Sequence, residues 1–260
     1  MKDAGGVDLV EAKSTSQARA LGIENMAQKS VEGRGVMIDL HAHVGRERAL
    51  IGYEELMRVL DADKVVVEQG DMVLLHTGFD EVLLEMEKRP DPALVHNVCA
   101  ALNGRDQKLL DWITRSGLSA LISDNYAVEA FPSVRHAGCG AALPLHEHCL
   151  FKLGVNLGEL WHLSPLARWL REHKRYRFLL TAPPLRLPGA VGSPATPVAT
   201  CECSQASLRR PALVRYLLRL TIACEDGAAC TSPRRGESPP RTRSGVDPRR
   251  RRGSGEGVTI

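Results

Sequence analysis

The sequence predicts an α/β fold. Short apolar runs, which are typical of buried strands, alternate along the chain with segments whose apolar residues recur at helical spacing. The 260 residues are 43% hydrophobic, which is enough for one sizeable core. No apolar run approaches the roughly 18 residues that a membrane-spanning helix needs, and the first residues lack the apolar core of a secretory signal. We therefore expect a cytoplasmic α/β protein.

The expected strands are short and largely apolar. Compact apolar runs bounded by turn residues are typical of strands that are buried in a sheet. Runs of this kind cover residues 33–40, 65–67, 72–75, 118–122 and 176–180.

Helices are expected at three places between and after these strands. Residues 53–60 and 106–113 carry apolar side chains at helical spacing. A further helix is expected from residue 164 to about residue 173. Ser164 is the expected N-cap of that helix, and Pro165 occupies the first helical position, where proline is favoured.

Three parts of the chain differ in composition. Residues 1–32 are weakly patterned, and residues 33–200 carry the expected strands and helices. Residues 201–260 are rich in Arg, Ser and Pro, and we expect a disordered tail because they cannot bury enough apolar surface to offset the entropy of ordering. Twelve Arg against six Asp or Glu give this tail +6, which leaves −3 of the total +3 for residues 1–200. This balance does not indicate a nucleic-acid surface, and the basic run at 249–252 is typical of a solvated segment.

Five segments resemble one known family. They are GRGVMID (33–39), GDMVLLHTG (70–78), SDNYAVE (123–129), LPLH (143–146) with a later GE (158–159), and PGAVGSPATPV (188–198). Their order and spacing are similar to those of the cyclase family, metal-dependent amide hydrolases that include bacterial kynurenine formamidase. The resemblance covers about two-thirds of the chain. It implies a mixed β-sheet flanked by helices and assigns residues 33–200 to a cyclase-like domain.

The resemblance also implies a metal centre. His146 and Glu159 match the family's metal-binding His and Glu, and imidazole and carboxylate groups are ligands that zinc or manganese accepts. We expect their side chains to approach within several Å, through a helix of about two turns and a tight turn at 156–158. The family's HxGTHxDxPxH motif, which carries the other ligands and the proton-shuttling His, is not found before Gly33. The domain is therefore expected to be truncated at its N-terminus, its activity is in doubt, and no catalytic residue is assigned.

The function that the resemblance implies is hydrolysis of an amide, either N-formylkynurenine from tryptophan catabolism or a related cyclic amide. The expected partners are this small molecule and further copies of the chain in a homo-oligomer, without nucleic acid or membrane. A catalytically dead paralogue that acts as a binding or subunit module stays open as an alternative.

Asp124 and Asn125 are candidate substrate-binding residues. They follow the strand expected at 118–122, and polar residues at strand ends commonly form sites in α/β proteins. The other interpretation is turn chemistry, since Asp and Asn hydrogen-bond to nearby backbone. Both interpretations stay open.

His41 and His43 favour a second kind of enzyme. A strand that ends in HxH is also the entry motif of amidohydrolase barrels, in which both His bind metal, and residues two apart share one face of a strand. Such a barrel needs eight βα units in typically ~250 residues. Only about 170 residues of this chain are well patterned, so the amidohydrolase is kept as an alternative. A serine hydrolase is not indicated, because no Gly-x-Ser-x-Gly segment occurs.

Overall fold

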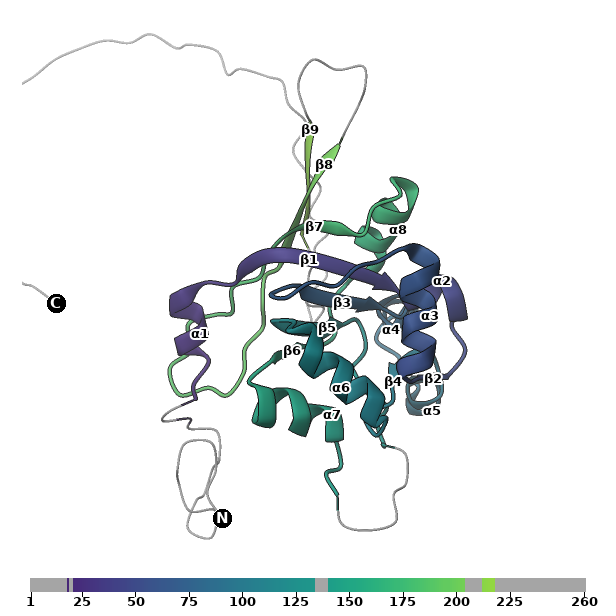
Figure 1. Cartoon of the computed structure of the whole chain (residues 1–260), viewed down its shortest axis with the longest axis horizontal. Helices are drawn as coiled ribbons and strands as arrows, with labels where there is room; N and C mark the ends of the chain where they lie inside the picture. The colour runs from purple at the N-terminus through teal and green to yellow at the C-terminus, as the bar shows by residue number, and fades with distance from the viewer. Residues whose placement is uncertain (1–17, 19–20, 134–139, 204–211, 218–260) are drawn as a thin grey trace, which may run out of the picture. The chain divides into compact units, whose positions relative to one another are not determined.

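The computed structural model describes residues 18, 21–133, 140–203 and 212–217. The chain divides into two units, 1–223 and 224–260, and every described residue belongs to the first. That unit is built on a seven-stranded sheet with the order β6-β5-β3-β1-β7-β8-β9 (Figure 1). The expected α/β fold with a mixed sheet flanked by helices is confirmed.

One half of the sheet is parallel and the other half is antiparallel. The parallel strands are β1 (Glu32–Asp39), β3 (Met72–His76), β5 (Ala120–Ser123) and β6 (Asn156–Gly158). The antiparallel strands are β7 (Arg177–Thr181), β8 (Val198–Cys203) and β9 (Ala212–Leu217). Two further parallel strands, β2 (Ala49–Ile51) and β4 (Ala100–Leu102), pair with each other.

The helices of the described residues are mostly short. They are α1 (Glu24–Lys29), α2 (Leu40–Val44), α3 (Tyr53–Asp63), α4 (Phe79–Glu85), α5 (Pro92–His96), α6 (Gln107–Ser116), α7 (Pro144–His146) and α8 (Ser164–Glu172). A π-helix, η1 (Glu147–Leu153), continues α7. In the described part of the chain, no helix has the length and apolar character that crossing a membrane requires.

The two faces of the sheet bury different sets of side chains. Alternate residues of a strand point to opposite faces, so Val73 of β3 packs against α3 and α6, while Leu74 packs against α8. The same alternation separates Val36 from Met37 in β1. Helices therefore cover both faces of the sheet (Figure 1).

Polar residues lie at the carboxyl ends of the parallel strands. Asp39 ends β1, His76 ends β3, Asp124 follows β5 and Glu159 follows β6. Parallel strands that run in the same direction bring their carboxyl ends together, and ligands of open α/β sheets bind beyond such ends. A functional site is therefore expected at the carboxyl ends of these strands.

Two details of the expected elements are wrong. Residues 65–67 form no strand, although Val65 is buried, because a three-residue apolar run can pack on the core without pairing. Ser164 does not cap α8. The N-cap position is Leu163, and the hydroxyl of Ser164 instead donates a hydrogen bond to the buried carboxylate of Asp80. A tertiary partner has taken the side chain that local sequence assigns to the helix end.

The expected boundary at Thr200 lies inside a strand. β8 runs through it and pairs with β9 by backbone hydrogen bonds, which require no apolar core. Most of the expected tail, residues 204–211 and 218–260, lies outside the described residues. Its disorder therefore stays a prediction.

Candidate functional site

His146 and Glu159 lie in hydrogen-bond contact. His146 ends α7, and η1 then leads the chain back to the edge strand β6. Glu159 follows β6 directly, which brings its Oε1 within 3.1 Å of Nε2 of His146. The expected approach of the two side chains is confirmed, although strand β6 replaces the tight turn expected at 156–158.

Glu129, which was not predicted as a site residue, holds His146 from the other side. Its Oε1 lies 2.9 Å from Nδ1 of His146, and the backbone N–H groups of Leu145 and His146 also donate to this carboxylate. The side chain is fully buried. Gly104 makes this possible, because a Cβ at that position would lie 1.9 Å from Oε2 of Glu129. The available sequence signal was that Glu129 ends the SDNYAVE segment.

The two carboxylates control the charge of the imidazole. Hydrogen bonds to Glu129 first and Glu159 second raise the pKa of His146 to about 9. Without a metal, the ring is therefore an imidazolium that donates from both nitrogens at neutral pH. A bound cation would replace the proton on Nε2, while Nδ1 would still donate to Glu129.

The geometry of His146 and Glu159 fits two positions around a divalent ion. Zinc ligands lie about 2.0–2.2 Å from the ion, so two that share it stand roughly 3–3.5 Å apart. The observed 3.1 Å between Nε2 and Oε1 falls in this range. With an ion bound, Glu129 would be the outer carboxylate that fixes the orientation of a ligating His. The pair would supply two of the three protein ligands that a catalytic zinc usually has.

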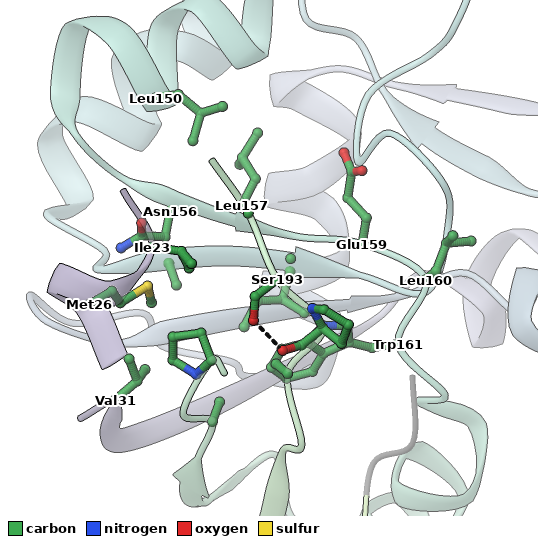
Figure 2. Close-up of a pocket in the computed structure, with 18 of the residues that line it drawn as sticks. Ile23, Met26, Val31, Leu150, Asn156, Leu157, Glu159, Leu160, Trp161 and Ser193 are labelled. Atoms are coloured by element: carbon green, nitrogen blue, oxygen red, sulfur yellow. Dashed lines mark hydrogen bonds between the residues drawn. The ribbon is translucent and has the colours of Figure 1, made fainter. Parts of the chain in front are cut away.

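A cavity of about 640 Å³ opens beside this pair. Its wall is mostly apolar, with Leu157 and Trp161 among the larger side chains, and Asn156 and Glu159 are among its few polar residues. Figure 2 shows Glu159, which directly follows the strand of Leu157, at the margin of the apolar side chains of the cavity. A small molecule with a flat apolar part and one polar group fits such a cavity.

Asp124 and Asn125 are buried and use their polar groups within the protein. Asp124 accepts from the backbone N–H groups of Thr77 and Gly78 and from the hydroxyl of Thr77. Asn125 accepts from the N–H of Val128 at 2.6 Å. Neither residue is among those that line the cavity. This placement favours turn chemistry over direct substrate contact.

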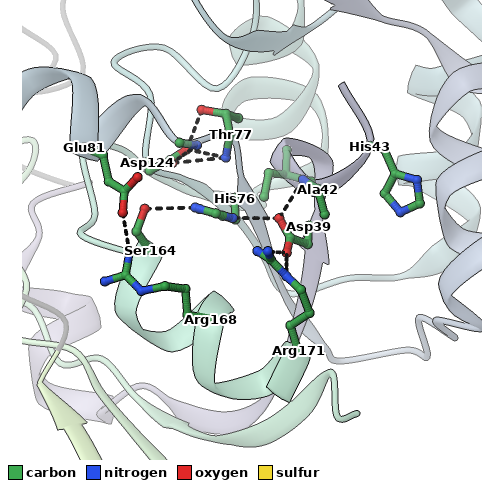
Figure 3. A network of polar contacts seen from close by, with 12 residues as sticks. Asp39, Ala42, His43, His76, Thr77, Glu81, Asp124, Ser164, Arg168 and Arg171 are labelled. Atoms are coloured by element: carbon green, nitrogen blue, oxygen red, sulfur yellow. Dashed lines mark hydrogen bonds and ion pairs between the residues drawn. The ribbon is translucent and has the colours of Figure 1, made fainter. Parts of the chain in front are cut away.

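A second polar network lies at the carboxyl ends of the same parallel strands. Nδ1 of His76 lies 2.7 Å from Oδ1 of Asp39, and Nε2 lies 2.9 Å from Oγ of Ser164. Figure 3 shows His76 between these two partners, with Arg171 against the other oxygen of Asp39. Burial acts to lower the pKa of His76, but hydrogen bonding to Asp39 and nearby negative charges outweigh it and raise the pKa.

This second network has the order Ser-His-Asp but not the chemistry of a hydrolase triad. Ser164 is 1% exposed, so no substrate reaches its hydroxyl. Its single proton goes to Oδ1 of Asp80, 2.6 Å away, and the pKa of Asp80 is about 2 because, against the effect of burial, hydrogen bonds from His162 and Ser164 lower it. The oxygen of Ser164 must then accept a hydrogen bond from Nε2–H of His76, whereas the hydroxyl of a nucleophilic serine donates its hydrogen bond to the histidine.

Comparisons with known proteins agree with this fold. The "Putative cyclase" family model matches residues 10–130. A solved structure described as a novel cyclase is 33% identical, with a TM-score of 0.59 over 75% of this chain and 61% of that one. The predicted resemblance to the cyclase family is confirmed. Isatin hydrolase A from Ralstonia solanacearum, at 17% identity, shares the fold with a TM-score of 0.50 over 76% of this chain and 69% of that one. No curated protein matches the chain.

The chain spans about three fifths of the length of the cyclase structure that it matches at 33% identity. The family model begins at residue 10, within the segment 1–32 that was expected to be weakly patterned, and ends just beyond Glu129. His146 and Glu159 therefore lie outside the matched model, and their role as metal ligands stays a prediction that rests on their motif and geometry.

The observed fold does not support the amidohydrolase alternative. The sheet is open and mixed, whereas that alternative requires a closed barrel of parallel strands. His41 and His43 lie on helix α2 and not on a strand, so residues two apart point to different sides. His43 pairs with Asp63 at 2.9 Å, while the ring of His41 faces His76. The amidohydrolase alternative places His41 and His43 at the end of a strand, but here Asp39 caps α2 by accepting from the N–H of Ala42.

Proposed function

We propose that the chain carries the site of a metal-dependent hydrolase that acts on a small amide. His146 and Glu159 are two ligands of a divalent ion, zinc or manganese. The substrate is N-formylkynurenine or a related cyclic amide. The observation that carries this proposal is the 3.1 Å contact between His146 and Glu159 at the wall of a mostly apolar cavity.

Each element of the site has a part in such a reaction. A bound divalent ion supplies an activated water and polarises the amide carbonyl. Glu129 keeps a proton on Nδ1 of His146 and so leaves Nε2 to face the ion. Leu157 and Trp161 offer an apolar surface to the aryl part of the substrate and exclude water from it.

The test is hydrolysis by the recombinant 260-residue protein with added zinc or manganese. The substrates are N-formylkynurenine and, because one structural neighbour is named an isatin hydrolase, a cyclic aryl amide. We expect turnover far below the ~10 per second of a typical enzyme, because two protein ligands hold a catalytic ion weakly. This residual activity should disappear with a chelator and in His146→Ala.

His148→Ala is the matched control, since His148 contacts Thr114 and not Glu159. Activity that survives both the chelator and His146→Ala would contradict the proposal. So would the absence of any metal-dependent hydrolysis of either amide. The homo-oligomer and the cytoplasmic location stay predictions from the sequence.

A further inference from the structure

Three possible metal ligands meet at the carboxyl ends of β1 and β3, apart from His146 and Glu159. Asp39, His41 and His76 each offer a donor atom, and these atoms lie within 4.8 Å of one another. None of the three lines the cavity beside Glu159. Two imidazole nitrogens and one carboxylate oxygen form a donor set that zinc and neighbouring transition metals accept.

The hydrogen bonds of Ser164 decide which nitrogen of His76 faces this group. The hydroxyl of Ser164 donates its only proton to Asp80, so its oxygen accepts from Nε2–H of His76. Nδ1 is left toward Oδ1 of Asp39 at 2.7 Å, where either a proton or a cation can join them. An outer hydrogen bond on one ring nitrogen is the usual support of a histidine that binds metal through the other.

His41 supplies the accessible side of the group. Among the described residues, its ring nitrogens make no hydrogen bond, and its ring lies edge-on to that of His76, with 5.3 Å between the centroids. The glycine at position 78 leaves room for it, because a Cβ there would lie 2.5 Å from Cδ2 of His41. The side chain is only partly buried, so an ion from solution can reach it (Figure 3 shows Asp39 and the buried His76).

A second group of possible ligands, His76 with Asp80 and Asp124, gives weaker support for a metal site. All three side chains are buried. Asp124 accepts three backbone and hydroxyl donors, and Asp80 is held by His162 and Ser164. Their oxygens are therefore already satisfied, and a cation would have to break these bonds without a route from solvent.

We propose that Asp39, His41 and His76 form a binding site for a divalent transition-metal ion such as Zn²⁺, separate from the ion of the proposed hydrolase site. The ion takes the place of the proton between Nδ1 of His76 and Oδ1 of Asp39. Arg171 holds the other oxygen of Asp39 and so favours binding through one oxygen only. Nδ1 of His76 and Oδ1 of Asp39 then move apart from 2.7 Å, and a small rotation of the partly exposed His41 ring brings its nitrogen closer. All three donors come to the roughly 3–3.5 Å spacing of a tetrahedral site, and water completes the shell.

The experiment uses the full 260-residue chain after treatment with a chelator. The background variant carries His146→Ala and Glu159→Gln, which removes both ligands of the hydrolase site. Zn²⁺ binding is measured by competition with a chromogenic chelator, and Co²⁺ is added to observe its visible absorption. We expect the background variant to bind one equivalent of metal.

His41→Ala in this background should weaken Zn²⁺ binding at least as much as the ~10–100-fold that loss of an outer-shell partner causes. His43→Ala, which removes an imidazole from the same helix on the side of Asp63, should leave binding unchanged. His41 is chosen because its partial exposure spares the core, and circular dichroism checks folding. No binding in the background variant, equal affinity after His41→Ala, or equal losses in both variants would overturn the proposal. None of these results depends on amide hydrolysis.

Discussion

The two histidines His146 and His76 lie near the carboxyl ends of the parallel strands and differ mainly in burial. Each uses both ring nitrogens, and each has a carboxylate on Nδ1: Glu129 for His146 and Asp39 for His76. The side chain of His146 is 23% exposed, whereas that of His76 is 3% exposed. His146 meets Glu159 at the wall of a cavity, while Nε2 of His76 is closed off by Ser164.

The comparison teaches that access, and not the set of neighbouring residues, separates a candidate reaction site from a structural network. An imidazole beside carboxylates stabilises the fold if it is sealed and can bind a solute if one nitrogen faces open space. His76 combines both conditions, since its Nε2 side is sealed and its Nδ1 side approaches the partly exposed His41. Four perturbations test this contrast.

The largest effect is expected when the sealed histidine is removed. His76→Ala leaves the buried side of Asp39 and the hydroxyl of Ser164 without their partner and opens a cavity in the interior. Breaking a buried charged pair typically destabilises a protein by about 3–5 kcal/mol. His146→Ala should lower the free energy of unfolding by less, about 1.5–3 kcal/mol, the range for hydrogen bonds to charged groups. The reason is that water can replace the bond to Glu159, and the buried Glu129 keeps its two backbone N–H donors. Urea denaturation measures both, and equal losses would break the contrast.

A smaller effect is expected from crowding the carboxylate behind His146. In Gly104→Ala the new Cβ would meet Oε2 of Glu129 at 1.9 Å, so this side chain must shift. Overpacking of this kind destabilises by about 1–3 kcal/mol. Metal affinity at His146 should also fall by about 10–100-fold, as when an outer-shell partner is lost. Gly192→Ala is the control, because nothing lies within 4 Å of a Cβ there. Unchanged affinity in Gly104→Ala would show that Glu129 does not orient His146.

The pH dependence of stability should report the charge of His146 in chelator-treated protein. The folded pKa of about 9 lies above the ordinary 6.5, so the stabilisation is fully present below pH 6.5 and is lost as the pH rises toward 9. After allowance for solvent screening of this partly exposed group, we expect a loss of about 1 kcal/mol. His146→Gln cannot titrate and should lack this part of the decline. Identical curves for the two proteins would contradict the charged imidazole.

The smallest effect is expected at the exposed partner of Asp39. Arg171 contacts Oδ2 of this carboxylate, but its side chain is half exposed. Exposed ion pairs stabilise by about 0.2–1 kcal/mol, and salt screens them. Arg171→Met should therefore change the free energy of unfolding by less than about 1 kcal/mol at low salt and by less at high salt. A loss as large as that of His76→Ala would mean that Arg171, and not His76, balances the charge of Asp39.

The sequence predicted the regular elements better than the contacts between them. Apolar runs and helical spacing located β1, β3, β5, β7, α3, α6 and α8, because burial imposes these periods on the chain. The same signals failed where a tertiary partner overrode local preference. Ser164 turned from helix capping to Asp80, and residues 65–67 packed on the core without pairing.

For the candidate site, the motif match located His146 and Glu159, and the fold brought them together. Glu129 and Gly104 were missed, because their contact with His146 joins residues that are distant along the chain and no local pattern encodes it. The sequence paired His41 with His43, whereas in the structure His41 lies beside His76. Its two-residue spacing from His43 suggested a shared strand face, whereas the capped turn at Asp39 rotates the two side chains apart.

The amino-acid sequence by itself determined the α/β class and the cyclase resemblance, since both depend on local periods and on short ordered motifs. It also named the imidazole and carboxylate of the proposed hydrolase site. Only the tertiary structure decided which histidines are accessible, which carboxylate lies behind each, and that Asp39, His41 and His76 meet. The physical reason is that burial and hydrogen-bond pairing are set by how distant strands and helices pack, and these contacts control the pKa of a side chain and the reach of a ligand.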